Sequence, residues 1–406
     1  MNSVPLRSKA SLELVPRSIE TEAFESVKIL IFSWNHQAIR IGESVVPERK
    51  IEWSVSYFYE SHPPDFFPNV EAILQSYDPD IAVFGSQEDA IPGSYFHSDF
   101  LPQKMAQLHY NLQKRTRLMG LGIETYKALK TFDFKLRGLR LSIYTKPYLT
   151  GIIELEERNM RDFLGEKGQT WANCSLPFLQ SKGAVASYLK IPGMAPMVFI
   201  CAHLPFDADS IKQAFLCHDA SIRGKAVERC NASFNYLLQE LVFNVKLEEF
   251  TSFEEKTDIG HIFFFGDLNY RVFSLQRGIE DKFLGANEET LRDLFLTYDE
   301  LHQELEKGRI RMDFKEGVQN QGPLFLPTCK MRKPRVDPKD ATDIQDLFNT
   351  GEGHRKPSWC DRLLHCDRKD SRYHIICDHY NRLDEGETMK KSDHAAVLGL
   401  YRLEKK

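Results

Sequence analysis

The sequence lacks paired cysteines. Its eight cysteines stand singly, without a C-x-x-C pair, at Cys174, Cys201, Cys217, Cys230, Cys329, Cys360, Cys366 and Cys377. A structural zinc site built from such pairs therefore has little support. A disulfide scaffold is disfavoured as well, because such scaffolds are usually shorter and denser in cysteine. We expect reduced thiols in a cytoplasmic protein.

Long apolar runs and an excess of positive charge are missing too. No stretch approaches the roughly 18–20 apolar residues that span a bilayer. The first 26 residues lack the apolar centre of a signal peptide, and the chain ends without a prenylation cysteine. The net charge of −5 gives no general attraction to nucleic acid or acidic membranes. We therefore expect no nucleic-acid partner, no transmembrane segment, and at most a transient, peripheral contact with a membrane surface.

The sequence does contain a series of short, nearly continuous apolar runs. They lie at Val27–Phe32, Ile81–Phe84, Leu139–Thr145, Ala184–Leu189, Met197–Ala202, Ile262–Phe265 and Ala395–Leu400. Continuous rather than alternating apolar character indicates strands that are buried on both faces. Helical patterns lie between them, notably over Gln213–Leu247 and Glu288–Glu306. Because no repeat or linker divides the chain, we predict one α/β domain over residues 27–406, preceded by a flexible segment over residues 1–26.

Polar residues gather next to these runs. Six clusters are of this kind, and we expect them just past strand ends: Asn35, Gln87-Glu88, His203, Asp267 with Asn269, Asp361, and Asp393-His394. Positions past strand ends are rigid and exposed, and α/β proteins build their sites there. Each cluster alone is a weak signal, since Asp and Asn favour turns and a single histidine is usually structural.

Together, the clusters supply the groups that metal-assisted hydrolysis of a phosphate ester requires. Glu88 offers a carboxylate to a hard cation, and magnesium favours one or two carboxylates plus waters. Asp267 can position or activate a water molecule. Three further side chains can contact phosphate oxygens: Asn269, His203 and His394. An aspartate paired with a histidine also fixes the tautomer of the ring and supports its charged form.

The order of these segments resembles the inositol polyphosphate 5-phosphatase family, a part of the exonuclease–endonuclease–phosphatase fold group. The two longest matches are Gly266-Asp267-Leu268-Asn269-Tyr270-Arg271 and Pro357-Ser358-Trp359-Cys360-Asp361-Arg362-Leu363-Leu364. Shorter matches are Ser33-Trp34-Asn35, Gln87-Glu88, Lys182–Ala186, His203-Leu204, Tyr298–Leu301, Phe325–Lys330 and Ser392-Asp393-His394. The resemblance runs from residue 28 to about residue 402. It implies a four-layer sandwich of two central β-sheets flanked by α-helices.

The resemblance also implies an activity, a cofactor and roles for individual residues. The activity is Mg²⁺-dependent removal of the 5-phosphate from phosphoinositide lipids or soluble inositol polyphosphates. The implied metal site is Glu88 with Asn35 beside it. The implied catalytic residues are Asp267, Asn269, His394, Asp361, His203 and Asp393, with Asp361 orienting the ring of His394. The implied substrate-binding residues are Lys330, which matches the lysine for the neighbouring 4-phosphate, and Arg355, Lys182 and Arg271.

The chain departs from the family pattern at three places. Cys329 stands where the family often has tyrosine, Gly353 stands where a lysine is usual, and residues 173–181 replace a glycine-rich segment. These differences leave the catalytic set intact and bear on the choice of substrate. Two alternatives stay open. One is a phosphodiesterase or nuclease of the same fold group, and the other is a catalytically weak relative that binds phosphoinositide.

Two residue types that often signal function are assigned structural roles here. We expect Trp34 and Trp359 to pack beneath the site. We expect Cys360 to be a buried thiol, because Cys360-Asp361-Arg362 lacks the cysteine-to-arginine spacing of a cysteine phosphatase loop.

Overall fold

The structure is a computed structural model, and it describes residues 24–35, 68–88, 119–124, 139–150, 152–155, 169–173, 182–243, 257–333, 335–350, 355–383 and 392–406. The predicted flexible segment therefore lies outside the described residues, apart from residues 24–26. Gly353 and residues 174–181 lie outside them as well. Among the described helices, none has both the length and the apolar character needed to cross a bilayer.

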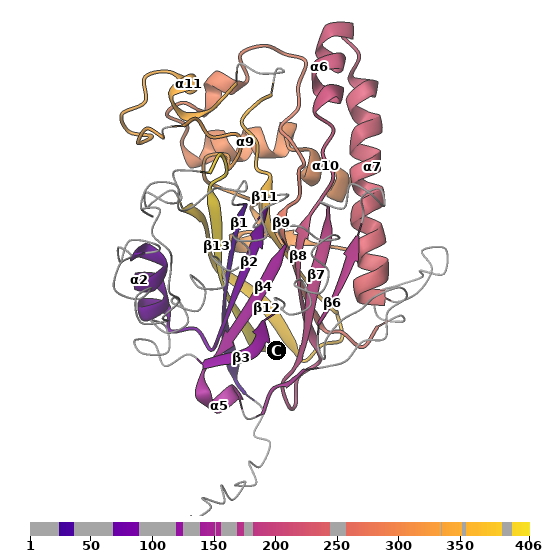
Figure 1. The fold of residues 1–406 in the computed structure, drawn as a ribbon, viewed down its shortest axis with the longest axis vertical. Coiled ribbons are helices and arrows are strands. Elements are labelled where there is room, and N and C mark those ends of the chain that lie inside the picture. Colours follow the sequence, from indigo (N-terminus) through magenta and orange to yellow (C-terminus); the bar gives the residue numbers. More distant parts are fainter. Residues whose placement is uncertain are drawn as a thin grey trace, which may run out of the picture.

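The described strands form two mixed β-sheets (Figure 1). The first sheet has the order β12-β13-β1-β2-β4-β3. Its strands are β12 (Tyr373–Leu383), β13 (Ala396–Lys405), β1 (Ser26–Asn35), β2 (Ile81–Gln87), β4 (Arg140–Thr145) and β3 (Met119–Glu124). The second sheet has the order β10-β11-β9-β8-β7-β5, and β6 pairs with β7. Its strands are β10 (Lys315–Glu316), β11 (Asp361–Asp367), β9 (His261–Asp267), β8 (Met197–His203), β7 (Gly183–Lys190), β5 (Glu154–Leu155) and β6 (Gln169–Asn173).

The two sheets pack face to face through an apolar core. Ile31 and Val83 of the first sheet share this core with Phe199 and Phe263 of the second, whose rings stack with centroids 5.1 Å apart. The sheets approach closely at Gly85, where a Cβ atom would lie 2.6 Å from Cε2 of Phe265. Every run predicted from the sequence as a buried strand is found in a sheet, because apolar residues on both strand faces require cover on both sides.

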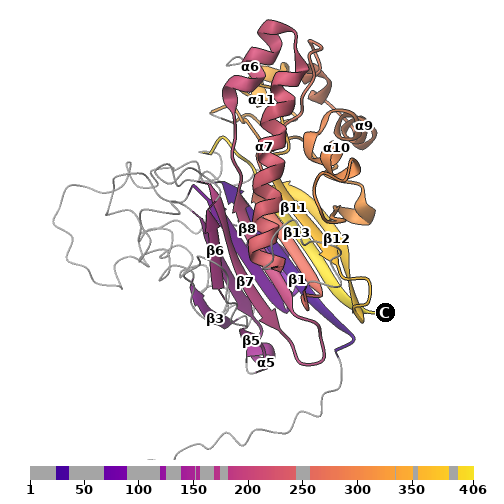
Figure 2. The ribbon, with the colours of Figure 1, turned by 90° about the vertical axis from the view of Figure 1, so that its right-hand side faces the viewer.

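Helices cover the outer face of each sheet. Helix α7 (Ala220–Leu238) packs on the second sheet, where Phe234 stacks on Phe264 with ring centroids 4.2 Å apart. Helix α2 (Pro68–Tyr77) places Leu74 against the first sheet, beside Leu30. The order of layers is therefore helix, sheet, sheet, helix, as Figure 1 shows, and Figure 2 shows α7 lying across the strands. The predicted four-layer sandwich is confirmed.

The prediction of two long helices from periodicity is wrong, because the structure divides each of them into shorter helices. The first breaks at His218, whose left-handed φ of 49° ends α6 (Ala208–Cys217), and Asp219 caps the start of α7. The π-helical turn η1 (Gln239–Phe243) then follows α7. The second breaks at Asp299, which ends α9 (Glu288–Tyr298) and caps α10 (Glu300–Glu306) by accepting a hydrogen bond from the His302 N–H. Aspartate is a preferred N-cap residue, so apolar periodicity can continue across a new helix start.

Short elements complete the described part of the chain. They are α5 (Pro147–Thr150), α11 (Ile344–Leu347), the 3₁₀ turn η3 (Glu280–Phe283) and η4 (Val318–Asn320). Helices α6, α9, α10 and α11 gather over one end of the two sheets (Figure 1). The predicted site residues lie at this end.

Candidate active site

The strand registers bring the predicted clusters to one edge of the two sheets. In the second sheet, His203 of β8 pairs with Asp267 of β9, and Asp267 pairs with Asp361 of β11. In the first sheet, Asn35 of β1 pairs with Gln87 of β2. Each of these side chains therefore starts from a backbone that is fixed by its neighbouring strand.

Two of the clusters reach this edge in a different way from the one predicted. Asp361 and His394 were expected past strand ends, but Asp361 is the first residue of β11 and His394 comes just before β13. Strands β11 and β13 run antiparallel to β9 and β1. The first residues of β11 and β13 therefore lie at the same edge as the last residues of β9 and β1. The predicted clusters still meet at this edge.

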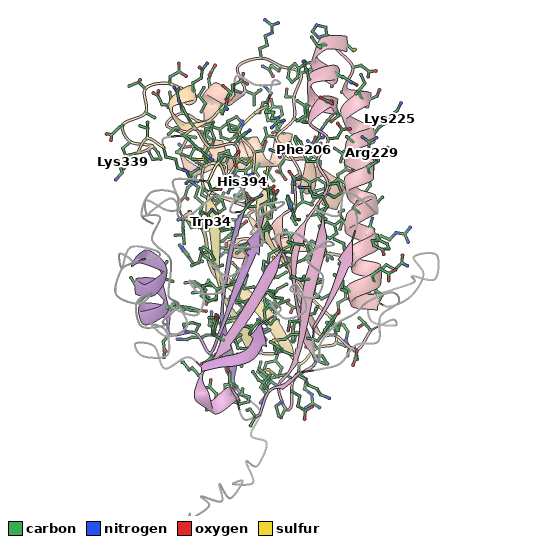
Figure 3. All side chains as sticks on the ribbon, viewed as in Figure 1. Trp34, Phe206, Lys225, Arg229, Lys339 and His394 are labelled. Carbon is green, nitrogen blue, oxygen red and sulfur yellow. The ribbon has the colours of Figure 1, made fainter. Side chains whose placement is uncertain are left out.

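His394 is held from several sides. Its Nδ1 atom lies 2.8 Å from Asp361 Oδ2, and its carbonyl oxygen accepts hydrogen bonds from Trp34 Nε1 at 3.2 Å and Arg335 Nη2 at 2.5 Å. Figure 3 shows Trp34 and His394 at the upper ends of the strands. Burial opposes the charged ring, yet the negative charges of Cys329, Asp361 and Asp267 raise the pKa of His394 well above its usual value. His394 is therefore an imidazolium at neutral pH, and Trp34 has the predicted structural role.

Asp267 is the most extensively contacted carboxylate of the site. Its Oδ2 accepts a hydrogen bond from Asn35 Nδ2 at 2.8 Å and lies 3.3 Å from His203 Nε2, while its Oδ1 accepts from the Asn269 backbone N–H at 3.1 Å. Burial works against ionisation here, but His394, His203 and Lys182 lower the pKa of Asp267 below its usual value. A permanently ionised carboxylate of this kind can orient a water molecule by accepting its hydrogen bond.

Glu88 and His203 extend the cluster toward solvent. Glu88 follows β2 with a left-handed φ of 53°, and its Oε1 lies 3.7 Å from His203 Nε2. The Glu88 side chain is 38 % exposed, whereas that of His203 is buried. Lys182 Nζ contacts His203 Nε2 directly. Burial and this lysine lower the pKa of His203, so His203 is neutral at pH 7.

The donor atoms of this region fit a hard divalent cation. Asp267, Asp361 and His394 each offer one ligand atom within 4.8 Å of the others. Both ring nitrogens of His394 already have neighbours, however, because Nδ1 lies 2.8 Å from Asp361 Oδ2 and Nε2 lies 3.3 Å from Cys329 Sγ. Glu88 contacts His203 and Asn35 contacts Asp267, and carboxylate and amide oxygens suit Mg²⁺. The buried Oε1 of Gln87 also has no hydrogen-bond partner among the residues that the structure describes.

Asn269 is positioned by Arg271. Asn269 has a left-handed φ of 57°, donates from Nδ2 to the Leu204 carbonyl oxygen at 2.9 Å, and accepts at Oδ1 from Arg271 Nη2 at 2.7 Å. The second N–H of the Asn269 amide remains available to a phosphate oxygen. Arg271 itself is 5 % exposed. The structure thus places Arg271 behind Asn269, and its direct contact with substrate stays a prediction.

Phe206 is a site residue that the sequence reasoning missed. Three guanidinium groups lie near its ring, with the carbon of Arg271 at 4.0 Å, that of Arg355 at 5.3 Å and that of Arg223 at 5.8 Å from the ring centroid. Such contacts orient cations over an aromatic face. Arg355, predicted to bind substrate, therefore lies on the same ring as Arg271. The signal in the sequence was the position of Phe206, three residues past His203 at a strand end.

Cys329 is a second missed feature. The sequence indicated only the loss of a tyrosine hydroxyl at this position. The structure places its Sγ atom 3.3 Å from His394 Nε2 and 3.3 Å from Arg271 Nη1. Cys329 therefore contacts the predicted catalytic imidazole directly. No residue pattern near Cys329 in the sequence predicts that contact.

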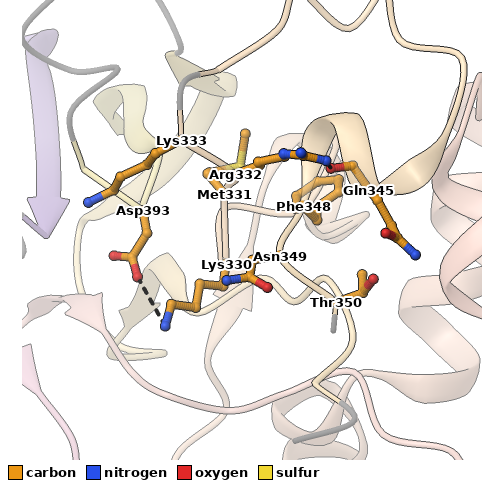
Figure 4. Close-up of a pocket in the computed structure, with 9 residues that line it drawn as sticks. All are labelled: Lys330, Met331, Arg332, Lys333, Gln345, Phe348, Asn349, Thr350 and Asp393. Carbon is orange, nitrogen blue, oxygen red and sulfur yellow. Dashed lines mark hydrogen bonds and ion pairs between the residues drawn. The ribbon is translucent and has the colours of Figure 1, made fainter. Parts of the chain in front are cut away.

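Lys330 lies beside a polar cavity of about 470 Å³. Figure 4 shows this cavity and the ion pair in which Lys330 Nζ lies 3.7 Å from Asp393 Oδ2. Its lining comprises Lys330, Met331, Arg332, Lys333, Gln345, Phe348, Asn349, Thr350 and Asp393. Asp393 Oδ1 is also 3.9 Å from His394 Nε2. The predicted substrate lysine thus lines a space large enough for a small charged group, next to the predicted catalytic histidine.

The chain matches known proteins in sequence and in fold. Residues 32–400 match the profile described as Endonuclease/Exonuclease/phosphatase family 2. Phosphatidylinositol 3,4,5-trisphosphate 5-phosphatase 2A of Danio rerio is 31 % identical over 185 residues, which are 46 % of this chain and 13 % of that protein. The chain therefore spans only a small part of the length of this curated relative.

Two solved structures show the same fold. One is the inositol polyphosphate 5-phosphatase domain of SPsynaptojanin in complex with inositol (1,4)-bisphosphate and a calcium ion. It has a TM-score of 0.54 and 18 % identity over 93 % of this chain and 84 % of that one. The other is a mutant of Cimex nitrophorin in a ferrous NO complex, with a TM-score of 0.53 and 15 % identity over 94 % of this chain and all of that one. Since the fold hosts such different proteins, function has to be argued from the site.

Proposed function

The chain belongs to the Endonuclease/Exonuclease/phosphatase family 2, and from this membership and the site we propose that it hydrolyses the 5-phosphate of phosphoinositides or soluble inositol polyphosphates. The proposal includes dependence on Mg²⁺, with Glu88 and Asn35 as the residues that would hold the ion. It also includes a peripheral location on the cytoplasmic side of membranes. The one observation that carries it is the meeting, at a single sheet edge, of Asp267, which accepts a hydrogen bond from Asn35, and His394, whose ring is held by Asp361.

Different residues of the chain have different roles in the in-line displacement of the phosphate by water. Asp267 accepts a hydrogen bond from the attacking water and fixes its direction. His394 would donate from Nε2 to a phosphate oxygen that replaces Cys329 Sγ, 3.3 Å away, as the acceptor, and Asp361 orients the ring through Nδ1. Asn269 offers its remaining amide N–H to a second phosphate oxygen. A bound divalent cation would offset negative charge on the phosphate.

Electrostatic stabilisation of this kind is strongest where donors are fixed before the reaction begins. His394 is held through its ring and its carbonyl oxygen, and Asn269 is held by Leu204 and Arg271. Neither side chain has to reorganise when the equatorial phosphate oxygens gain charge. This rigidity supports a hydrolase over a protein that only binds the headgroup.

Substrate recognition in this proposal depends on a few cations. Lys330, at the edge of the cavity, faces the phosphate next to the one that is cleaved. Arg355, whose guanidinium lies over the ring of Phe206, provides a second positive charge. Lys182 stays close to His203. The name of the zebrafish relative indicates a 3,4,5-trisphosphate lipid as its substrate, and this lipid is therefore one of the candidates for the present chain.

The test is phosphate release, with Mg²⁺ and with excess chelator, from a panel of substrates. The panel holds soluble inositol trisphosphate, the 4,5-bisphosphate and 3,4,5-trisphosphate lipids in vesicles, a generic phosphodiester, and DNA. We expect chelator-sensitive release from the 5-phosphorylated inositols, and their ranking identifies the preferred substrate. Cleavage of only the diester or DNA would replace the proposal with a phosphodiesterase or nuclease. Vesicle binding without any cleavage would favour a binding relative.

A further inference from the structure

Cys329 has an unusual environment for a buried thiol. Its sulfur lies 3.3 Å from the imidazole Nε2 of His394 and 3.3 Å from the guanidinium Nη1 of Arg271, and Cys329 itself is 2 % exposed. Neighbouring cations stabilise a thiolate, and the thiolate is the form of cysteine that reacts with oxidants. Two positively charged neighbours therefore give this sulfur the surroundings of a reactive cysteine.

A second thiol lies beside the first. The side chains of Cys329 and Cys360 interact, and each changes the pKa of the other. The backbone keeps them together, because Cys329 and Ser358 exchange two hydrogen bonds, at 3.0 and 2.6 Å, and the Cys360 N–H donates to Thr328 Oγ1 at 3.2 Å. The contact thus belongs to a rigid part of the site.

The surroundings of the two thiols act on ionisation in opposite directions. The interaction with Cys360 holds the pKa of Cys329 well below its usual value despite burial, with further help from His394 and Arg271. Burial raises the pKa of Cys360. The pair therefore places a thiol whose ionisation is favoured beside one whose ionisation is disfavoured, which is the arrangement of an oxidisable cysteine beside a resolving cysteine.

We propose that Cys329 is a site of oxidation by hydrogen peroxide and that Cys360 resolves the oxidised form into a disulfide. In the first step the Cys329 thiolate attacks one peroxide oxygen, so an S–O bond forms, the O–O bond breaks, and hydroxide leaves to take up a proton as water. In the second step the Cys360 sulfur attacks the Cys329 sulfur, so an S–S bond forms and the S–O bond breaks. Hydroxide leaves again and takes the Cys360 proton. Two thiols and one peroxide give one disulfide and two waters.

The consequence for the site rests on the proposed function. In the disulfide, the Cys329 sulfur can no longer carry a negative charge next to His394 and Arg271. The bond also constrains the backbone next to Lys330, which lines the cavity. We expect phosphate release to fall at least about tenfold on oxidation and to recover with dithiothreitol. The formation of the disulfide, in contrast, does not depend on which substrate the site accepts.

The primary test is therefore a mass measurement. The reduced full-length chain is treated with hydrogen peroxide, alkylated, digested, and searched for the Cys329–Cys360 linked peptide, with phosphate release followed in parallel. We expect the linked peptide to accumulate before any other cysteine is modified. Absence of the linked peptide, or earlier oxidation of the exposed Cys217 on α6, would overturn the proposal. Formation of the disulfide in a chain that releases no phosphate even when reduced would refute the proposed function alone.

Two variants sharpen the result. In Cys360→Ser the resolving thiol is gone, so we expect a sulfenic acid on Cys329 that a dimedone-type probe labels. Cys217→Ser is the matched control, because it removes a thiol outside the site, and it should form the linked peptide at the wild-type rate. Equal dimedone labelling of the wild type and Cys360→Ser would show that Cys360 does not resolve Cys329. If Cys360→Ser fails to fold, the time course of labelling in the wild type decides the same point.

Discussion

Asn35 donates a hydrogen bond from Nδ2 to Oδ2 of Asp267 across 2.8 Å, although 232 positions separate the two residues in the chain. Asn35 ends β1 in the first sheet, and Asp267 ends β9 in the second. This bond helps to join the two sheets at the site. Relative displacement of the sheets would therefore change the direction of the carboxylate that we propose orients the attacking water.

Removal of either principal catalytic group should abolish most of the activity. We expect Asp267→Ala and His394→Ala each to lower turnover by at least about a hundredfold, the scale for losing a base or a fixed donor to the transition state. Initial rates of phosphate release from the preferred substrate measure this effect. Asp209→Ala is the matched control, because Asp209 is exposed on α6. Wild-type turnover in either site variant would contradict the assigned roles.

The Asp361–His394 pair predicts a pH dependence. Although burial opposes it, Cys329, Asp361 and Asp267 raise the pKa of His394. The protonated ring therefore persists below this raised pKa, and kcat should fall only as the pH rises through it. In Asp361→Asn that pKa drops, so the fall of kcat should move to lower pH. Profiles of kcat between about pH 5 and 10 test this, and an unshifted alkaline limb would show that His394 is not the titrating group.

Lys330 should act on substrate binding. A charge-assisted hydrogen bond is worth about 1.5–3 kcal/mol, so Lys330→Ala should raise KM for 4,5-bisphosphorylated substrates by roughly ten- to a hundredfold. We expect kcat to change much less. Lys339→Ala is the control, because Lys339 is exposed and lies away from His394 in Figure 3. Equal KM effects in the two variants would indicate general attraction by surface charge.

Glu88 should control the metal requirement. Replacing its carboxylate in Glu88→Gln removes the negative charge and keeps the size, so the Mg²⁺ concentration at half-maximal rate should rise at least about tenfold. Titration calorimetry of Mg²⁺ into both proteins gives a measurement that needs no turnover. Unchanged Mg²⁺ affinity in Glu88→Gln would move the metal site to other oxygens.

The stability of the site depends on a buried ion network beneath it. Arg362 is fully buried, with Nη1 3.0 Å from both Oδ1 and Oδ2 of Asp299 and Nε 2.7 Å from Glu316 Oε1. Arg362→Met leaves two buried carboxylates without their partner, which should lower the free energy of unfolding by about 3–5 kcal/mol. Urea unfolding measures this loss. The exposed Arg292→Met on α9 should stay within about 0.5 kcal/mol of wild type, and similar losses in both would refute the network's role.

Local sequence determined most of the elements and the chemical identity of the site. Buried strands could be predicted from continuous apolar runs, because a strand that is covered on both faces has no need of polar residues. The residues next to those runs gave the carboxylates, amides and histidines. Helix boundaries were less well determined, because the apolar spacing continues across Asp299, which ends α9 and caps α10.

The tertiary structure alone decided which of these groups meet. The pairing of Asp361 with Asp267 follows from the antiparallel register of β11 and β9, and the contact of Cys329 with His394 joins segments 65 residues apart. The guanidinium groups of Arg271 and Arg355 share the ring of Phe206 for the same reason. Such contacts are set by strand pairing and sheet packing over long separations. Propensity and periodicity act over a few residues, so the sequence provides the groups and only the folded chain sets the distances between them.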